Sequence, residues 1–359
     1  MIENIILFKV LLPTLVAFVL GIMMTPFLSH LFYKYKLWKR SPRISPDNTK
    51  SIDASGMGVH FQKIHNEQET KTPRVGGIIV WLSVVLTVIL SIFSQRIIMD
   101  LGIPNIEFIS RNQTLIPLVS LLLGAGLGLI DDFLQIFGTK KQLTIGIPRR
   151  IRIFFVLALG LAEGLWFYIK LGHDGIQLPF HSGELFLGWL FVLFFMFVVL
   201  ALFSSSVIDG VDGLAPGVLA SIFASYGFIG LIQSQFDIAT FSFVVMGALL
   251  AFLWFNIPPA RFYLGETGIL ALTLSLSVII FLTNTVFEFI LIGLPLIVTA
   301  GSSLIQIISR RYFNKKVFLV APLHHHLEAL GWSRYKITMR YWVLSVMCSA
   351  AGIILVIIG

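Results

Sequence analysis

Five acidic residues lie at the edges of long apolar segments, where an ionised side chain is costly. Two are adjacent in GLIDDF, two are separated by two residues in SVIDGVDG, and one follows in FYLGETG: Asp131, Asp132, Asp209, Asp212 and Glu266. Crowded carboxylates at such a boundary repel each other and lose hydration, so a cation, arginines or protons must compensate. Mg²⁺ fits best, because it binds carboxylate oxygens and often has phosphate oxygens of a substrate among its other ligands. The pattern therefore favours phosphoryl transfer, in which positioning and charge neutralisation dominate.

Each acidic motif also has a simpler explanation. An Asp-Asp pair can end a helix in solvent, DGVDG can be an ordinary turn, and Glu266 can stabilise the start of a helix. The position of all three motifs at one set of loops favours the functional interpretation, since those loops are identified below from lysine and arginine alone.

Histidines and basic residues provide further candidates. The motif APLHHHLE contains His324, His325 and His326, and neighbouring helical residues point about 100° apart, so the three cannot all bind one metal. They suit phosphate or nucleotide binding, or holding a loop. In ETKTPRVGG, Lys71 and Arg74 could reach a phosphate or anchor a helix at lipid headgroups.

The elements that must position these residues are membrane helices. The chain has 359 residues, of which 57% are hydrophobic and 12% charged, with a mean hydropathy of +0.90. A soluble domain has about a quarter charged residues. We predict an all-α, polytopic membrane protein with about ten spans, because the apolar runs are continuous and each is near the length that crosses a bilayer. The expected spans are 5–31, 76–95, 114–130, 151–170, 184–204, 213–233, 238–255, 267–284, 287–308 and 341–358.

The basic residues fix the expected orientation. Of 26 lysines and arginines, 22 fall in the odd-numbered loops, which the positive-inside rule places in the cytoplasm with both termini outside. We therefore expect a single ten-helix transmembrane domain, residues 1–359, with long cytoplasmic loops at about 32–75, 131–150 and 309–340. A transporter is the main alternative of another class, but it would bury its polar site near the midplane, where Glu163 is the one carboxylate expected within a span. Nucleic acid is not an expected partner, because no basic aromatic domain lies outside the membrane.

The ordered set of motifs TPRVGG, DD, DGVDGLA, FNIPPARFYLGETG and APLHHHLE resembles the polyprenyl-phosphate N-acetylhexosamine-1-phosphate transferases, over nearly the whole chain. The triple histidine is typical of the branch that acts on phospho-N-acetylmuramoyl-pentapeptide. The resemblance implies transfer of this group from UDP-MurNAc-pentapeptide to undecaprenyl phosphate, giving lipid I and UMP for peptidoglycan synthesis. It also implies Mg²⁺, a homodimer, and an active site on the cytoplasmic face of the bacterial inner membrane. A sister transferase that uses UDP-N-acetylglucosamine, or an inactive homologue retained for binding, are the related alternatives.

The resemblance also assigns roles to residues. It implies that Asp131 or Asp132 acts as a base or nucleophile, that Asp209 and Glu266 bind the metal, and that His324 and His325 contact the phosphates. The residues that it implies in substrate binding are Lys71, Arg74, Asp209, Gly210, Val211, Asp212, Asn256, Tyr263 and His326. The chain departs from the family pattern where Glu266 replaces an aspartate, Ser206 an asparagine and Gln135 a lysine. The family's lysine before TP aligns near Glu69, and Arg74 is expected to supply some of the positive charge that this missing lysine would give.

Overall fold

The computed structural model describes residues 2–39, 71–100, 108–110, 114–138, 146–180 and 183–359. Residues 40–70 and 139–145, which belong to two of the predicted cytoplasmic loops, lie outside the described residues. The described chain is almost entirely helical, as predicted, and its one sheet is an antiparallel hairpin of two short strands, β1 (Gly175–Gln177) and β2 (Glu184–Phe186). The main helices are α1 (Ile2–Lys34), α4 (Gly77–Asp100), α5 (Leu115–Phe137), α6 (Arg149–Trp166), α7 (Leu190–Ser204), α8 (Leu214–Ile232), α9 (Phe236–Asn256), α10 (Gly265–Leu282), α11 (Glu288–Ile292), α12 (Leu294–Phe313), α13 (Leu323–Ala329) and α14 (Arg334–Ile358).

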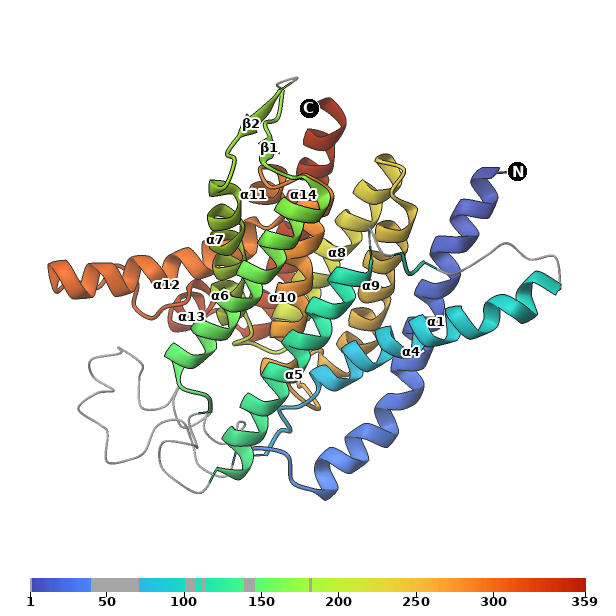
Figure 1. The fold of residues 1–359 in the computed structure, drawn as a ribbon. Coiled ribbons are helices and arrows are strands. Elements are labelled where there is room, and N and C mark those ends of the chain that lie inside the picture. Colours follow the sequence, from blue (N-terminus) through green and yellow to red (C-terminus); the bar gives the residue numbers. More distant parts are fainter. Residues whose placement is uncertain (1, 40–70, 101–107, 111–113, 139–145, 181–182) are drawn as a thin grey trace.

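Nine helices among the described residues are long and apolar enough to cross a membrane. They correspond to nine of the ten predicted spans. The predicted span 287–308 differs, because the chain breaks at Gly293 into the short α11 and the longer α12, which lies across the direction of the neighbouring helices in Figure 1. The break has a local cause: Pro295 lies in the first turn of α12 and has no N–H to continue the hydrogen bonds of α11.

The chain nevertheless passes from one end of the bundle to the other between α10 and α13. At the end of α10, the Thr283 carbonyl accepts a hydrogen bond from Gln233 at the end of α8. The histidines of α13, in contrast, lie against Gly210, just before α8 begins. The broken segment α11–α12 therefore makes the passage that the sequence predicts for a single helix.

The predicted site motifs gather at one end of the bundle, and both termini lie at the other, the C-terminus beside the β-hairpin (Figure 1). At the motif end, the last residues of α1, α5 and α9 meet the first residues of α4, α10 and α14. The hydrogen bonds that join them include Tyr33 Oη to the Arg261 carbonyl, Gly76 N–H to the Tyr263 carbonyl and Thr338 Oγ1 to the Asp212 carbonyl. The termini thus share one side, as the charge pattern predicts.

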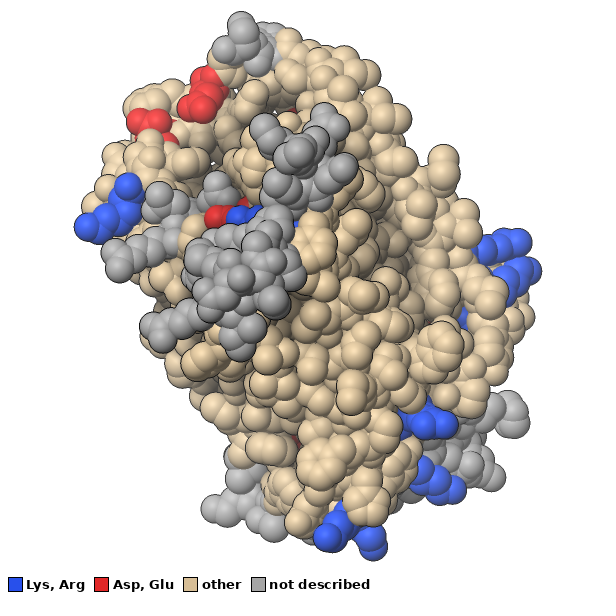
Figure 2. Space-filling view, turned by 90° about the vertical axis from the view of Figure 1, so that its right-hand side faces the viewer, with Lys and Arg blue, Asp and Glu red and all other residues tan. Residues whose placement is uncertain are grey.

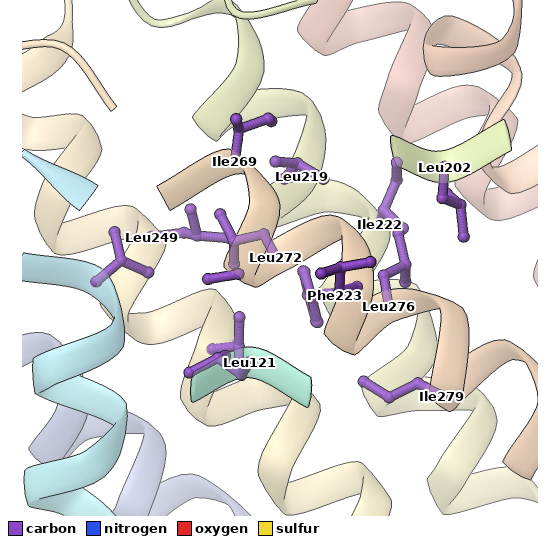
Figure 3. Packing of buried hydrophobic residues seen from close by; sticks show 14 of the residues in the cluster. Leu121, Leu202, Leu219, Ile222, Phe223, Leu249, Ile269, Leu272, Leu276 and Ile279 are labelled. Atoms are coloured by element: carbon purple, nitrogen blue, oxygen red, sulfur yellow. The ribbon is translucent and has the colours of Figure 1, made fainter. Parts of the chain in front are cut away.

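The core lies along α8, α9 and α10, which are the most buried of the candidate spans. Figure 3 shows Ile222 and Phe223 of α8 beside Leu272 and Leu276 of α10. The peripheral helices expose large apolar side chains instead, as expected of surfaces that face lipid. Figure 2 shows one such face, where uncharged side chains cover the middle and most charged ones lie near the margins.

The helices α5 and α10 have glycines at their contact. A Cβ atom on Gly124 would lie 2.6 Å from the Leu270 carbonyl oxygen, and one on Gly128 would overlap the backbone of Glu266. Small residues four apart allow helix backbones to approach closely in membranes. The approach is reinforced where Thr267 Oγ1 donates to the Ala125 carbonyl, 3.1 Å away. This contact fixes the start of α10 against the end of α5.

The glycine contact yields a stability prediction with an internal control. Gly128→Ala should lower the free energy of unfolding by about 1–3 kcal/mol, because the methyl group forces apart two backbones that have no flexible side chain to move. Gly126→Ala, on the same helix, should leave stability unchanged or raise it, since nothing lies within 4 Å of the added atom. Thermal unfolding of both variants in detergent measures the difference, and equal melting temperatures would contradict the proposed packing constraint.

Candidate active site

Asp132 lies at the last turns of α5 and is wholly buried against the first turn of α10. Its Oδ1 accepts a hydrogen bond from the Glu266 N–H at 3.2 Å, and its Oδ2 accepts one from the Thr267 N–H at 2.9 Å. These N–H groups have no partner within their own helix, and the helix dipole places partial positive charge there. The start of α10 therefore stabilises the negative charge of Asp132 and fixes its orientation.

Asp131 is also fully buried but is bound to different groups. Its Oδ2 accepts a hydrogen bond from Gln135 Nε2 at 2.7 Å, and its Oδ1 accepts one from the Ile147 N–H at 2.5 Å. An Arg152 nitrogen lies 3.5 Å from Oδ2. Asp131 thus connects the end of α5 to the start of α6, and the adjacent aspartates have different surroundings.

Arg152 bridges two acids, since it also lies 3.1 Å from Glu266 Oε1. Sequence reasoning counted this residue only toward membrane orientation. The available signal was its place at the cytoplasmic start of a predicted span, close in sequence to Asp131 and Asp132. The other carboxylate oxygen, Glu266 Oε2, is buried and has no hydrogen-bond partner among the described residues.

Asp209 follows the short helix Ser205–Ile208 that extends α7. Burial is the main cause that raises the pKa of Asp209 to about 7, and the charges of Glu266 and Asp212 raise it further. The Arg74 charge and a hydrogen bond from the Gly265 N–H act in the opposite direction. Asp209 is therefore a carboxyl group whose ionised form needs a compensating cation.

One cluster results, formed by Asp132, Asp209 and Glu266 around the start of α10. Arg74 interacts electrostatically with both aspartates. The cluster requires glycine at position 265, where φ is +70° and a Cβ atom would overlap the Arg74 carbonyl oxygen and lie 2.7 Å from Asp132 Oδ2. The structure thus brings together acids that are separated by 134 residues along the chain.

The cluster fits a magnesium ion that is bound partly by the protein and partly by a substrate. Among the described residues, no three His, Cys, Asp or Glu side chains are placed to hold a metal by themselves. Mg²⁺ usually takes one or two carboxylates and completes its octahedron with water and phosphate oxygens. The partnerless Glu266 Oε2 and the destabilised Asp209 carboxylate are suitable ligands of that kind.

The DGVDG segment is held by a loop that follows α9. Asn256 Oδ1 accepts a hydrogen bond from the Gly213 N–H at 2.9 Å, and its Nδ2 donates to the Phe262 carbonyl at 2.7 Å. Asp212 Oδ2 accepts one from the Ala260 N–H at 3.1 Å. Asn256 and Asp212 therefore both join the two motifs.

The remaining residues predicted to bind substrate differ in how far their side chains are exposed and in what they contact. The side chain of Val211 is part of the apolar core, so a ligand at this turn would meet its backbone. Tyr263 pairs through its backbone with TPRVGG, because its N–H donates to the Pro73 carbonyl at 2.8 Å. Lys71, at the start of that segment, is exposed.

Two of the three histidines face Gly210. A Cβ atom on Gly210 would overlap Nε2 of buried His324 and lie 3.0 Å from Nε2 of His325. His326 points elsewhere: its Nδ1 accepts a hydrogen bond from the Leu319 N–H at 3.2 Å, and its ring packs on Phe318. His326 therefore holds a loop, and phosphate or nucleotide binding by His324 and His325 stays a prediction.

Comparisons with known proteins identify relatives of this chain. Residues 114–284 match the model of "Glycosyl transferase family 4". The chain is similar to the phospho-N-acetylmuramoyl-pentapeptide-transferase of Latilactobacillus sakei, with 31% identity over 95% of this chain and 96% of the relative. It is 27% identical to the protein of the same name from Bacillus subtilis over 100% of this chain and 98% of the relative. The family model covers the DD, DGVDGLA and FNIPPARFYLGETG motifs, and the match to the Bacillus subtilis protein also includes TPRVGG and APLHHHLE.

The position of Asn256 leads to a stability prediction. Asn256→Ala should lower the free energy of unfolding by about 2 kcal/mol or more, because it leaves two buried backbone groups, Gly213 N–H and Phe262 C=O, without partners. Denaturation of the purified variant measures this loss. A variant as stable as the parent protein would show that these two bonds do not hold the DGVDG segment.

Proposed function

Because the chain belongs to the family of phospho-N-acetylmuramoyl-pentapeptide transferases, we propose that it transfers phospho-N-acetylmuramoyl-pentapeptide from UDP to undecaprenyl phosphate. The products are lipid I and UMP, and the reaction serves peptidoglycan synthesis. The proposal rests on full-length relatives with that name and on the convergence of Asp132, Asp209 and Glu266 with two histidines at one end of the helix bundle.

The chemistry is a substitution at phosphorus. An oxygen of the lipid phosphate attacks the phosphorus that carries the sugar and forms a new P–O bond. The bond from that phosphorus to the bridging oxygen breaks, and the electron pair leaves with UMP. Charge accumulates on phosphate oxygens throughout, so catalysis depends on positioned positive charge and hydrogen-bond donors.

The two aspartates of α5 suit different tasks. Asp131 is bound to Gln135, to the Ile147 N–H and to Arg152, so it organises the junction of α5 and α6. Asp132 lies within the acidic cluster beside Glu266 and Arg74. We assign Asp132 as the group that accepts the proton of the lipid phosphate.

Other residues of the chain would bind the nucleotide sugar. Arg74, His324 and His325 would meet the diphosphate, and the backbone of the DGVDG turn with Tyr263 would meet the uracil. Asp209 and Glu266 would hold a magnesium ion, which when bound neutralises phosphate charge. Each of these contacts is part of the proposal.

The charge pattern supports a cytoplasmic site. The same end of the bundle carries the motifs and most of the basic loops, so we propose that it faces the cytoplasm of a bacterial inner membrane. That location suits a water-soluble nucleotide donor and an acceptor whose tail stays in the bilayer. A homodimer is the expected assembly. A transporter is disfavoured, because the clustered acids lie at one end of the helices.

An assay of nucleotide release tests the proposal. The purified protein, given UDP-MurNAc-pentapeptide and undecaprenyl phosphate with Mg²⁺, should release UMP, and chelation of the metal by EDTA should abolish release until Mg²⁺ is restored. A parallel reaction with UDP-N-acetylglucosamine separates the sister activity. Release from that donor alone would overturn the proposed substrate, and release that is unaffected by chelation would overturn the metal requirement.

A single substitution tests the role of Asp132. Asp132→Asn should reduce turnover by a factor of about 100 or more, because the amide cannot accept the proton of the lipid phosphate. Asp174→Asn, the same change at the opposite end of the protein, should retain the parent rate. Near-parental turnover of Asp132→Asn, measured by UMP release, would exclude Asp132 as the base.

A further inference from the structure

Glu328 lies between two basic groups behind the histidines that face Gly210. Its Oε2 is 2.6 Å from His325 Nδ1, and its Oε1 accepts a hydrogen bond from Arg334 Nε at 2.9 Å. The Glu328 side chain is only 6% exposed, so both bonds form away from water. A buried carboxylate with two such partners holds them in fixed positions.

The bond to Glu328 determines which nitrogen His325 presents to the site. An ionised carboxylate only accepts hydrogen bonds, so the proton of this bond must reside on Nδ1. The other nitrogen, Nε2, then faces Gly210, where a Cβ atom would lie 3.0 Å from it. When both ring nitrogens carry protons, Nε2–H is a donor for a phosphate oxygen, and the bond to Glu328 prevents the ring from turning away.

Arg334 connects this arrangement to the rest of the site. It is the first residue of α14, whose next turns hold the DGVDG segment. Thr338 Oγ1 donates to the Asp212 carbonyl at 3.0 Å, and Trp342 Nε1 donates to the Gly213 carbonyl at 3.0 Å. The Glu328–Arg334 pair therefore joins α13 to the helix that positions the opposing turn.

We propose that Glu328 is a positioning residue for substrate binding. It holds the His325 ring so that Nε2 meets a phosphate oxygen of the nucleotide, and Arg334 keeps the Glu328 carboxylate in place. This inference rests on the proposed function, because it takes the ligand to be a uridine nucleotide with a diphosphate. It adds two residues, Glu328 and Arg334, that sequence reasoning did not assign to the site.

A double-mutant cycle separates this role from a merely structural one. The measured quantity is the Kd of UDP in the presence of Mg²⁺, by titration calorimetry on the full-length protein in detergent. Glu328→Gln should raise the Kd by about tenfold in the parent protein, which corresponds to the loss of about one hydrogen bond to a charged group. In the His325→Ala background, the same change should raise it less than about twofold. Glu184→Gln, an exposed glutamate at the opposite end, is the matched control and should leave the Kd unchanged.

The possible results are distinct. An equal loss of affinity in both backgrounds, or no loss in either, would overturn the positioning role. If Glu328→Gln does not fold, Glu328→Asp keeps the charge for Arg334 but withdraws the carboxylate from His325, and its effect should likewise disappear with His325→Ala. A parent protein that binds no UDP and releases no UMP would refute the proposed function and this inference together. If the parent protein binds UDP but the effects of the Glu328 and His325 substitutions on the Kd are additive, only this inference is refuted.

Discussion

The site depends on the close approach of α5 and α10. Gly124 and Gly128 remove the side chains that would separate these helices, so the end of α5 reaches the unbonded N–H groups at the start of α10. Asp132 accepts hydrogen bonds from those groups, and the geometry of the acidic cluster follows. The same contact that buries apolar surface thus places a carboxylate where the helix dipole offsets its charge. The close contact of α5 and α10 therefore determines both the helix packing and the position of the Asp132 carboxylate.

The acidic cluster holds negative charge that is destabilised by burial and by repulsion between the carboxylates, and arginines compensate part of it. Asp209 loses hydration and feels the charges of Glu266 and Asp212, which is why its pKa is near neutrality. Arg74 and Arg152 reduce the repulsion, and each reaches two acids. A substrate that brings phosphates would add negative charge to this environment, so the arrangement makes sense for a site that also receives a cation.

The three histidines make different contacts, which their spacing in the sequence implies only in part. Three consecutive helical residues must point in different directions, and the structure shows where each one goes. His324 and His325 lie against Gly210, whereas His326 holds the loop that precedes α13. The role of His325 further depends on Glu328, a residue one turn away, and on Arg334 from the next helix. Side chains that bind a ligand thus rely on others that never contact it.

The amino-acid sequence by itself determined the membrane class, nearly all of the spans, the shared side of the termini and the end of the bundle where the motifs lie. These properties follow from local composition, since apolar length and loop charge are read one segment at a time. Only the tertiary structure decided that Arg152 bridges Asp131 and Glu266, and that Asp131 and Asp132 have different partners. Those features depend on which helices are in contact and on how they are shifted along each other. Small residues and hydrogen bonds between distant segments determine both, and hydrophobic periodicity carries no information about them.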